Sequence, residues 1–79
     1  MNITDFVLVT NKLKEFLTEN ATQIDKMIKG EVFQKRKEIT IEQEAQYYDM
    51  TFIFRKGGLI KKSTLEVIVN GAMTAKILI

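Results

Sequence analysis

The segment Tyr48-Asp49-Met50-Thr51-Phe52-Ile53-Phe54-Arg55 decides the fold class of this chain of 79 residues. Its large apolar side chains recur at every second position, which is the pattern of a β-strand that buries one face. The same alternation occurs before it, around residues 38–42, and after it, over residues 64–69 and 73–79. We therefore predict four strands, over about residues 32–43, 46–56, 59–70 and 73–79.

The turns between these strands are predicted from glycine and from polar residues. Gly57-Gly58 and Asn70-Gly71 are typical of hairpins, because tight hairpin turns require positive φ. Residues 43–45 are expected to separate the first two strands, which places residues 35–37 close to 52–54. A two-residue turn at Gly57-Gly58 predicts the pairs Phe52–Ser63 and Met50–Leu65. A three-residue loop over 70–72 predicts Val67–Ala75 and Leu65–Ile77, which keeps one face apolar.

The first third of the chain has the period of a helix instead. Its apolar residues recur at spacings of three and four, which places them on one face; they are Phe6, Val9, Leu13, Phe16, Leu17, Ile24, Met27 and Ile28. Asn2 or Thr4 can cap the start, and Gly30 suits the end. We predict a helix over residues 3–29, with the alternative of a break near 19–21, where Asn20 interrupts the apolar face.

These elements predict a single α+β domain over residues 1–79. One N-terminal helix packs on a four-stranded antiparallel meander sheet, in the order α-β-β-β-β. The helix stripe also resembles a short heptad pattern, but a helix that lies on a sheet explains the same spacing.

The composition argues against catalysis. The chain contains no Cys and no His, so the thiol nucleophile and the commonest general base are missing. Glu38, Glu42, Glu44 and Asp49 are expected near the first strand turn, where solvated charge is favoured over a Mg²⁺ or Ca²⁺ site. We predict no enzymatic activity, no metal site and no cofactor.

The composition also bears on location and origin. The net charge is only +2, and the first residues lack the basic and apolar regions of a signal peptide. No apolar run reaches membrane-spanning length. We predict a cytoplasmic protein without a membrane partner. The abundance of Lys and Ile, without Pro, resembles products of AT-rich genomes, such as those of phages or mobile elements.

Two surfaces are candidates for binding. The outward positions of the sheet include the apolar residues Tyr47, Ile53, Ile68 and Leu78, which predict a protein interface if they form one patch. Seven cations are expected at one end of the sheet, namely Lys35, Arg36, Lys37, Arg55, Lys56, Lys61 and Lys62. This basic group suits nucleic-acid phosphates or an acidic partner, and it equally suits a solvated hairpin end.

The function predicted from the sequence is that of a small non-enzymatic binding or inhibitor protein. It would act by protein–protein contact, as a homodimer and on a host protein such as a defence nuclease. The alternative is a nucleic-acid-binding protein that uses the basic hairpin end.

Overall fold

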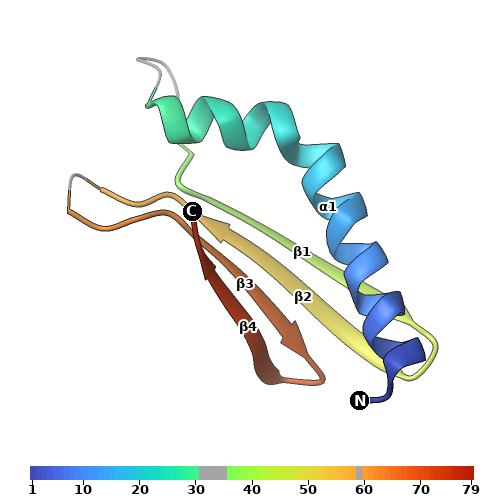
Figure 1. The fold of residues 1–79 in the computed structure, drawn as a ribbon. Coiled ribbons are helices and arrows are strands. Elements are labelled where there is room, and N and C mark those ends of the chain that lie inside the picture. The colour runs from blue at the N-terminus through green and yellow to red at the C-terminus, as the bar shows by residue number, and fades with distance from the viewer. Residues whose placement is uncertain (31–35, 59) are drawn as a thin grey trace.

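The computed structural model describes residues 1–30, 36–58 and 60–79. Its elements follow the order α1 (Ile3–Lys29), β1 (Glu38–Ala45), β2 (Tyr48–Arg55), β3 (Thr64–Val69) and β4 (Ala72–Leu78). The strands form one antiparallel sheet in the order β1-β2-β3-β4, and α1 lies on one face of it (Figure 1). The predicted α+β class and α-β-β-β-β order are confirmed.

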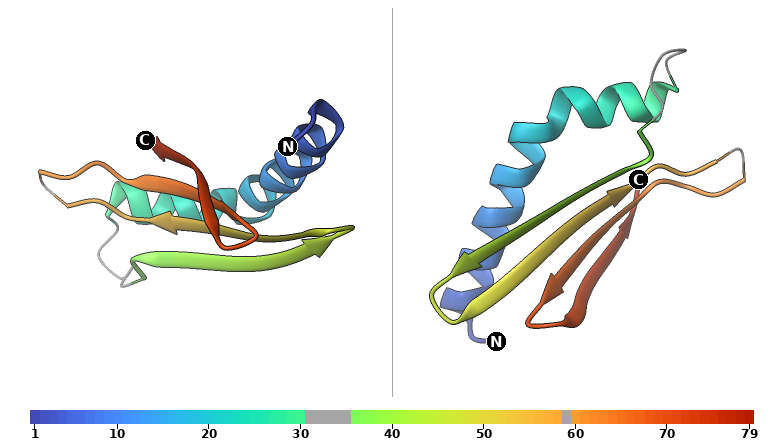
Figure 2. Two further views of the ribbon diagram at one scale, coloured as in Figure 1. Left: turned by 90° about the horizontal axis from the view of Figure 1, so that it is seen from below. Right: turned by 180° about the vertical axis from the view of Figure 1, so that it is seen from behind.

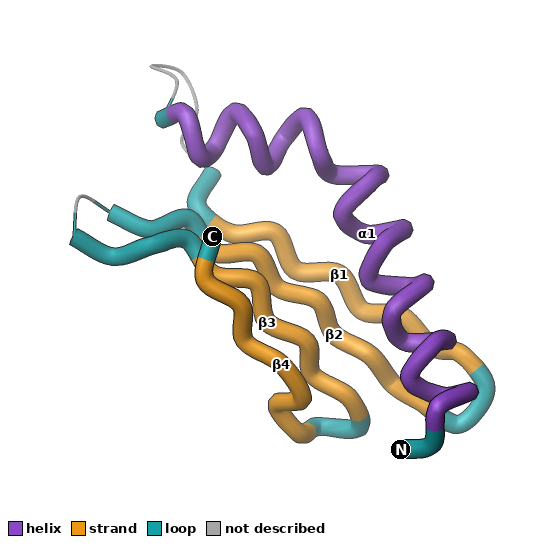
Figure 3. Tube along the Cα trace, in the orientation of Figure 1, coloured by secondary structure: helices purple, strands orange, loops and turns teal. Residues whose placement is uncertain are grey.

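Helix α1 is continuous, so the alternative of a break near 19–21 is wrong. The Asn2 side chain accepts a hydrogen bond from the Asp5 amide at 2.9 Å, and Gly30 ends the helix at a φ of 65°. Asn20 caps no second helix; its side-chain amide donates to the Phe16 carbonyl at 2.9 Å. The Thr18 hydroxyl donates to the Lys14 carbonyl at 2.8 Å. Such hydroxyl bonds to the preceding turn often bend helices, and α1 bends in its middle (Figure 3).

The core lies between the inner face of the sheet and one stripe of α1. Val9, Phe16 and Met27 form that buried stripe, and the Phe16 ring stacks on Phe52 with centroids 5.7 Å apart. The Tyr48 hydroxyl donates to an Asp5 carboxylate oxygen at 2.6 Å, which attaches the start of α1 to β2.

The first hairpin turns later than predicted. β1 continues through residues 43–45, which pair with Met50, Asp49 and Tyr48, and the turn is formed by Gln46 and Tyr47. Gln46 adopts a φ of 55°. The turn contains no glycine or asparagine, so the residue types typical of turns do not predict its position.

The connection between β2 and β3 is not the predicted two-residue turn. β2 ends at Arg55 and β3 begins at Thr64, so the predicted third strand over 59–70 starts too early. Gly57 is needed for a close approach instead: a Cβ there would lie 2.1 Å from the Lys61 carbonyl oxygen. The Gly57 amide also donates to the Ser63 hydroxyl at 3.0 Å. Residue 59 lies outside the described residues.

The resulting β2–β3 register differs from the prediction by an even number of residues. Phe52 pairs with Val67 and Met50 pairs with Val69, each four positions beyond the predicted partner. Because side chains alternate with a period of two, an even shift leaves every residue on its predicted face. The predicted beginning of the first strand at residue 32 lies outside the described residues, and described residues 36 and 37 precede β1.

The β3–β4 register is confirmed, although its loop is not. Val67 pairs with Ala75 and Leu65 with Ile77, as predicted. The loop has two residues, Asn70 and Gly71, with φ of 49° and 79°. The extra residue is absorbed by an irregularity next to Ile68 rather than by the loop.

The helix covers the sheet unevenly. α1 approaches β2 more closely than any other strand, while β4 forms the far edge (Figure 2). Phe6 remains 56% exposed and Ile77 44% exposed, although the sequence pattern placed both on apolar faces that bury each other. The structure therefore leaves apolar side chains uncovered on the helix side of the sheet.

Candidate interaction surfaces

The four apolar residues predicted as an interface do not form one patch. Tyr47, 91% exposed, lies in the β1–β2 turn at one end of the sheet, and Leu78, 63% exposed, ends β4 at the other. Ile53 is only 7% exposed, so it offers little area to a partner. Ile68 is half-buried beside it, paired with Thr51. The structure brings Ile53 and Ile68 together, but not Tyr47 and Leu78.

An ionic network around Arg55 lies where β2 ends and β1 begins. Its guanidinium Nε donates to a Glu38 carboxylate oxygen at 3.0 Å, and its Nη1 donates to Glu66, whose side chain is buried. Glu38 also accepts a hydrogen bond from the Thr40 hydroxyl at 2.9 Å. The Thr40 hydroxyl and Arg55 lower the pKa of Glu38, while Glu66 and Glu38 raise the pKa of Arg55. Ile53 pairs with Glu66 and Thr40, next to this network.

The structure alters the predicted basic group in two ways. The Lys56 amide donates to the Lys37 carbonyl at 2.8 Å, so residues 36 and 37 lie beside the β2–β3 connection and not beside 52–54. Arg55 is bound to two carboxylates and is not available as a free cation. Lys61 and Lys62 line a hollow with Lys56. Lys35 lies outside the described residues.

Two further cations join this group from the helix. Lys26 and Lys29 occupy the last turn of α1, and the Lys56 ammonium lies 3.2 Å from where a Cβ on Gly30 would be. The predicted basic group of seven cations does not include these two lysines. The basic end is therefore formed by Lys26, Lys29, Arg36, Lys37, Lys56, Lys61 and Lys62.

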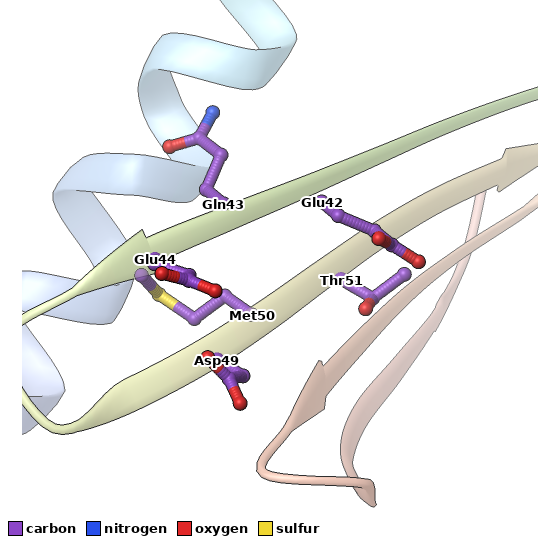
Figure 4. A pocket seen from close by; sticks show the side chains of 6 residues that line it. All are labelled: Glu42, Gln43, Glu44, Asp49, Met50 and Thr51. Carbon is purple, nitrogen blue, oxygen red and sulfur yellow. The ribbon is translucent and has the colours of Figure 1, made fainter.

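The opposite end of the sheet is acidic. Figure 4 shows a hollow where the carboxylates of Glu42, Glu44 and Asp49 come from neighbouring strands β1 and β2. We call these three residues the acidic end. Glu38 does not belong to it, because six residues of strand, about 20 Å, separate it from Glu44. Among residues 1–30, 36–58 and 60–79, no group of three acidic side chains is arranged to hold a metal ion.

Besides the outer-face residues, the basic end and the acidic end, the structure shows a further surface that the sequence analysis did not predict. It lies beside the core. Phe6, Leu17 and Ile28 are spaced by eleven residues, which is about three helical turns, so they form one stripe along α1. Ile28 lines the same hollow as Ile79, so this stripe faces the uncovered inner side of β4 at that end. We call Phe6, Ile28, Ile77 and Ile79, each 44–56% exposed, the apolar flank. Periodicity placed these residues on apolar faces but could not show how far the helix reaches across the sheet.

Comparisons with known proteins add no relationship. No family model matches the chain, and neither the curated proteins nor the solved structures contain a significant match. Within the part of the chain that the structure describes, α1 lacks the apolar character needed to cross a membrane.

Proposed function

We propose that this chain is a small non-enzymatic binding protein that acts by protein–protein contact in the cytoplasm, on a host protein. The observation that carries this proposal is the apolar flank. Half-exposed Phe6, Ile28, Ile77 and Ile79 lie on the helix side of a molecule whose small core leaves them uncovered. Exposed apolar surface rimmed by charge is characteristic of interaction sites. Ile28 and Ile79 line one hollow with Lys56, Lys61 and Lys62, and Phe6 continues the helix stripe toward the other end of α1.

A matched pair of helix variants tests this proposal. Ile28→Glu places a charge on the apolar flank, whereas Val7→Glu places one on a half-exposed helix position outside that stripe. Tagged wild type and both variants would be used to capture partners from a lysate of the source cell, and any captured protein would be purified and its Kd measured. We expect Ile28→Glu to weaken binding by about 10-fold or more, as at an interface hot spot, and Val7→Glu to retain it. Equal affinity of both variants, or no purified partner that binds, would overturn the proposal.

A second candidate function is nucleic-acid binding, and one observation favours it. The basic end contains seven cations. They come from three separate segments, namely the last turn of α1, the residues before β1 and the β2–β3 connection. Lysines that neutralise phosphates release counterions, so affinity should fall steeply with salt.

The test compares lysines at and away from the basic end. Fluorescence anisotropy with labelled duplex DNA and single-stranded RNA would be measured at several salt concentrations. Lys61→Glu should weaken binding and reduce the salt slope, while Lys14→Glu, in the middle of α1, should change the affinity less. Absence of binding at low salt, or an equal effect of both variants, would refute this second function.

A further inference from the structure

Strand β4 presents an open hydrogen-bonding edge. Among residues 1–30, 36–58 and 60–79 it pairs only with β3, and the Ile79 amide donates to the Ser63 carbonyl at 2.9 Å. Backbone amide and carbonyl groups point to alternate sides along an antiparallel strand, so those of Ile77 and Ala75 also point toward β3. The amide and carbonyl groups of Lys76 and Leu78 therefore point away from the sheet.

This edge lacks most of the features that prevent sheet edges from associating. Natural edges are protected by charges, prolines and bulges. β4 carries one charge, Lys76, and no proline, and its single irregularity lies opposite Ile68, near the turn. The half that ends at Leu78 is regular. It also carries the exposed apolar side chains of Ile77 and Leu78, and the exposed Ile79 follows it.

The charges at the two ends of the sheet favour one orientation for a partner strand. β4 starts beside the acidic end, because Asn70 exchanges two hydrogen bonds with the Asp49 backbone. It runs to the basic end, where Ile79 lines the hollow with Lys61 and Lys62. When two copies pair antiparallel along β4, the basic end of one copy and the acidic end of the other lie toward the same end of the joined sheet. A parallel arrangement places like charges together.

We propose that a second copy of this chain pairs with β4 in antiparallel orientation, about a two-fold axis at Ile77, to form one continuous sheet. In this register Lys76 lies opposite Leu78 of the second copy, and Ala75 lies opposite Ile79. An axis at Lys76 would oppose two lysines directly, which is destabilising. An axis at Ala75 would require pairing by the irregular part of β4, opposite Val67 and Ile68.

This inference deepens the proposed function, since it names one protein partner and replaces the outer-face interface with the β4 edge. It rests on the proposed function only because both assume that the chain acts by protein–protein contact. Sedimentation of the pure protein tests self-pairing without any host protein, so failure of the capture experiment and failure of self-pairing are separate results.

Cysteine cross-linking tests the position of the axis. Residues opposite each other in a non-hydrogen-bonded pair have Cα atoms about 4.5 Å apart, within disulfide range, and the chain has no native cysteine. Ile77→Cys should form a disulfide-linked dimer on mild oxidation. Tyr47→Cys, more exposed but at the other end of the molecule, should react many-fold more slowly. Equal cross-linking rates of the two variants would overturn the proposed register.

A charge pair at position 78 tests the same seam without cysteine. Leu78→Lys and Leu78→Glu both remove the apolar side chain, but only the lysine opposes Lys76 of the second copy. Two such cross-strand pairs per dimer should make the Kd of Leu78→Lys about 2- to 30-fold weaker than that of Leu78→Glu in sedimentation equilibrium. A strictly monomeric wild type, or equal Kd values for the two variants, would overturn the proposal. A monomer whose β4 edge binds only an extended peptide would overturn it as well.

Discussion

Phe16 and Phe6 occupy the same apolar pattern of the helix, but the structure predicts very different costs for truncating them. Phe16 is fully buried and stacks on Phe52, whereas Phe6 is more than half exposed. Truncation of a buried Phe to Ala costs about 3–5 kcal/mol. A chain of 79 residues has a total stability of about 4–12 kcal/mol. Phe16→Ala should therefore remove about a quarter or more of the stability, and Phe6→Ala about 1 kcal/mol or less.

The assay is equilibrium unfolding in urea, followed by circular dichroism at one low protein concentration so that self-association contributes equally. Each kcal/mol corresponds to a shift in Tm of about 4–8 °C for a domain of this size. A double-mutant cycle of Phe16→Leu and Phe52→Leu isolates the ring contact, for which we expect a coupling of about 0.5–1.5 kcal/mol.

Two results would refute this reasoning. Equal destabilisation by Phe6→Ala and Phe16→Ala would mean that a different stripe of α1 faces the sheet. Additivity of the two leucine substitutions to within about 0.3 kcal/mol would mean that the rings do not contact each other.

Three further predictions concern polar contacts. Asn2→Ala should cost about 1 kcal/mol in the same unfolding assay, because it removes the acceptor for the Asp5 amide; Asn2→Asp, which keeps an acceptor, should not. The hydrogen bond to Asp5 raises the pKa of Tyr48, so the stability it supplies is present at neutral pH and lost as pH rises through that raised pKa. Asp5→Asn should lower this pKa, measured by phenolate absorbance in a Tyr47→Phe background, and an unchanged titration would contradict the contact. The Thr40 hydroxyl and Arg55 lower the pKa of Glu38, so that stabilisation is present above the ordinary carboxyl pKa and lost as pH falls through the lowered value. Glu38→Gln should flatten the acid limb of stability against pH, and an unaltered limb would show that the network does not act in solution.

The elements and faces of this fold were predictable because they depend on periodicity alone. Phe52 and Phe54 face the core in any register shifted by an even number of residues, so the four-residue error between β2 and β3 changed no face. The turns were less predictable. Asn70-Gly71 turns as its chemistry indicates, whereas Gly57 serves a close approach to the Lys61 carbonyl.

The candidate surfaces were predicted less well, because the exposure of their side chains depends on how the helix and the strands pack on one another. Ile53 alternates outward as expected, yet its neighbours leave it buried. Lys26 joins the basic end because the continuous helix places its last turn, with Gly30, next to Lys56 in the β2–β3 connection. The reach of α1 across the sheet is a tertiary property, and Ile77, on the edge strand β4, is left half-exposed.

The position of α1 over β2 also sets an order in which the sheet should come apart. In the sheet that the structure describes, β4 is bonded to one neighbour and is not the strand that the helix approaches most closely, whereas β2 lies between two strands and beneath the helix. Local openings should therefore begin at β4 in a single copy, and amide hydrogens there should exchange with solvent well before those of β2. A partner bound along that strand would slow exchange where the isolated molecule is most labile, which links the folding of its last strand to assembly.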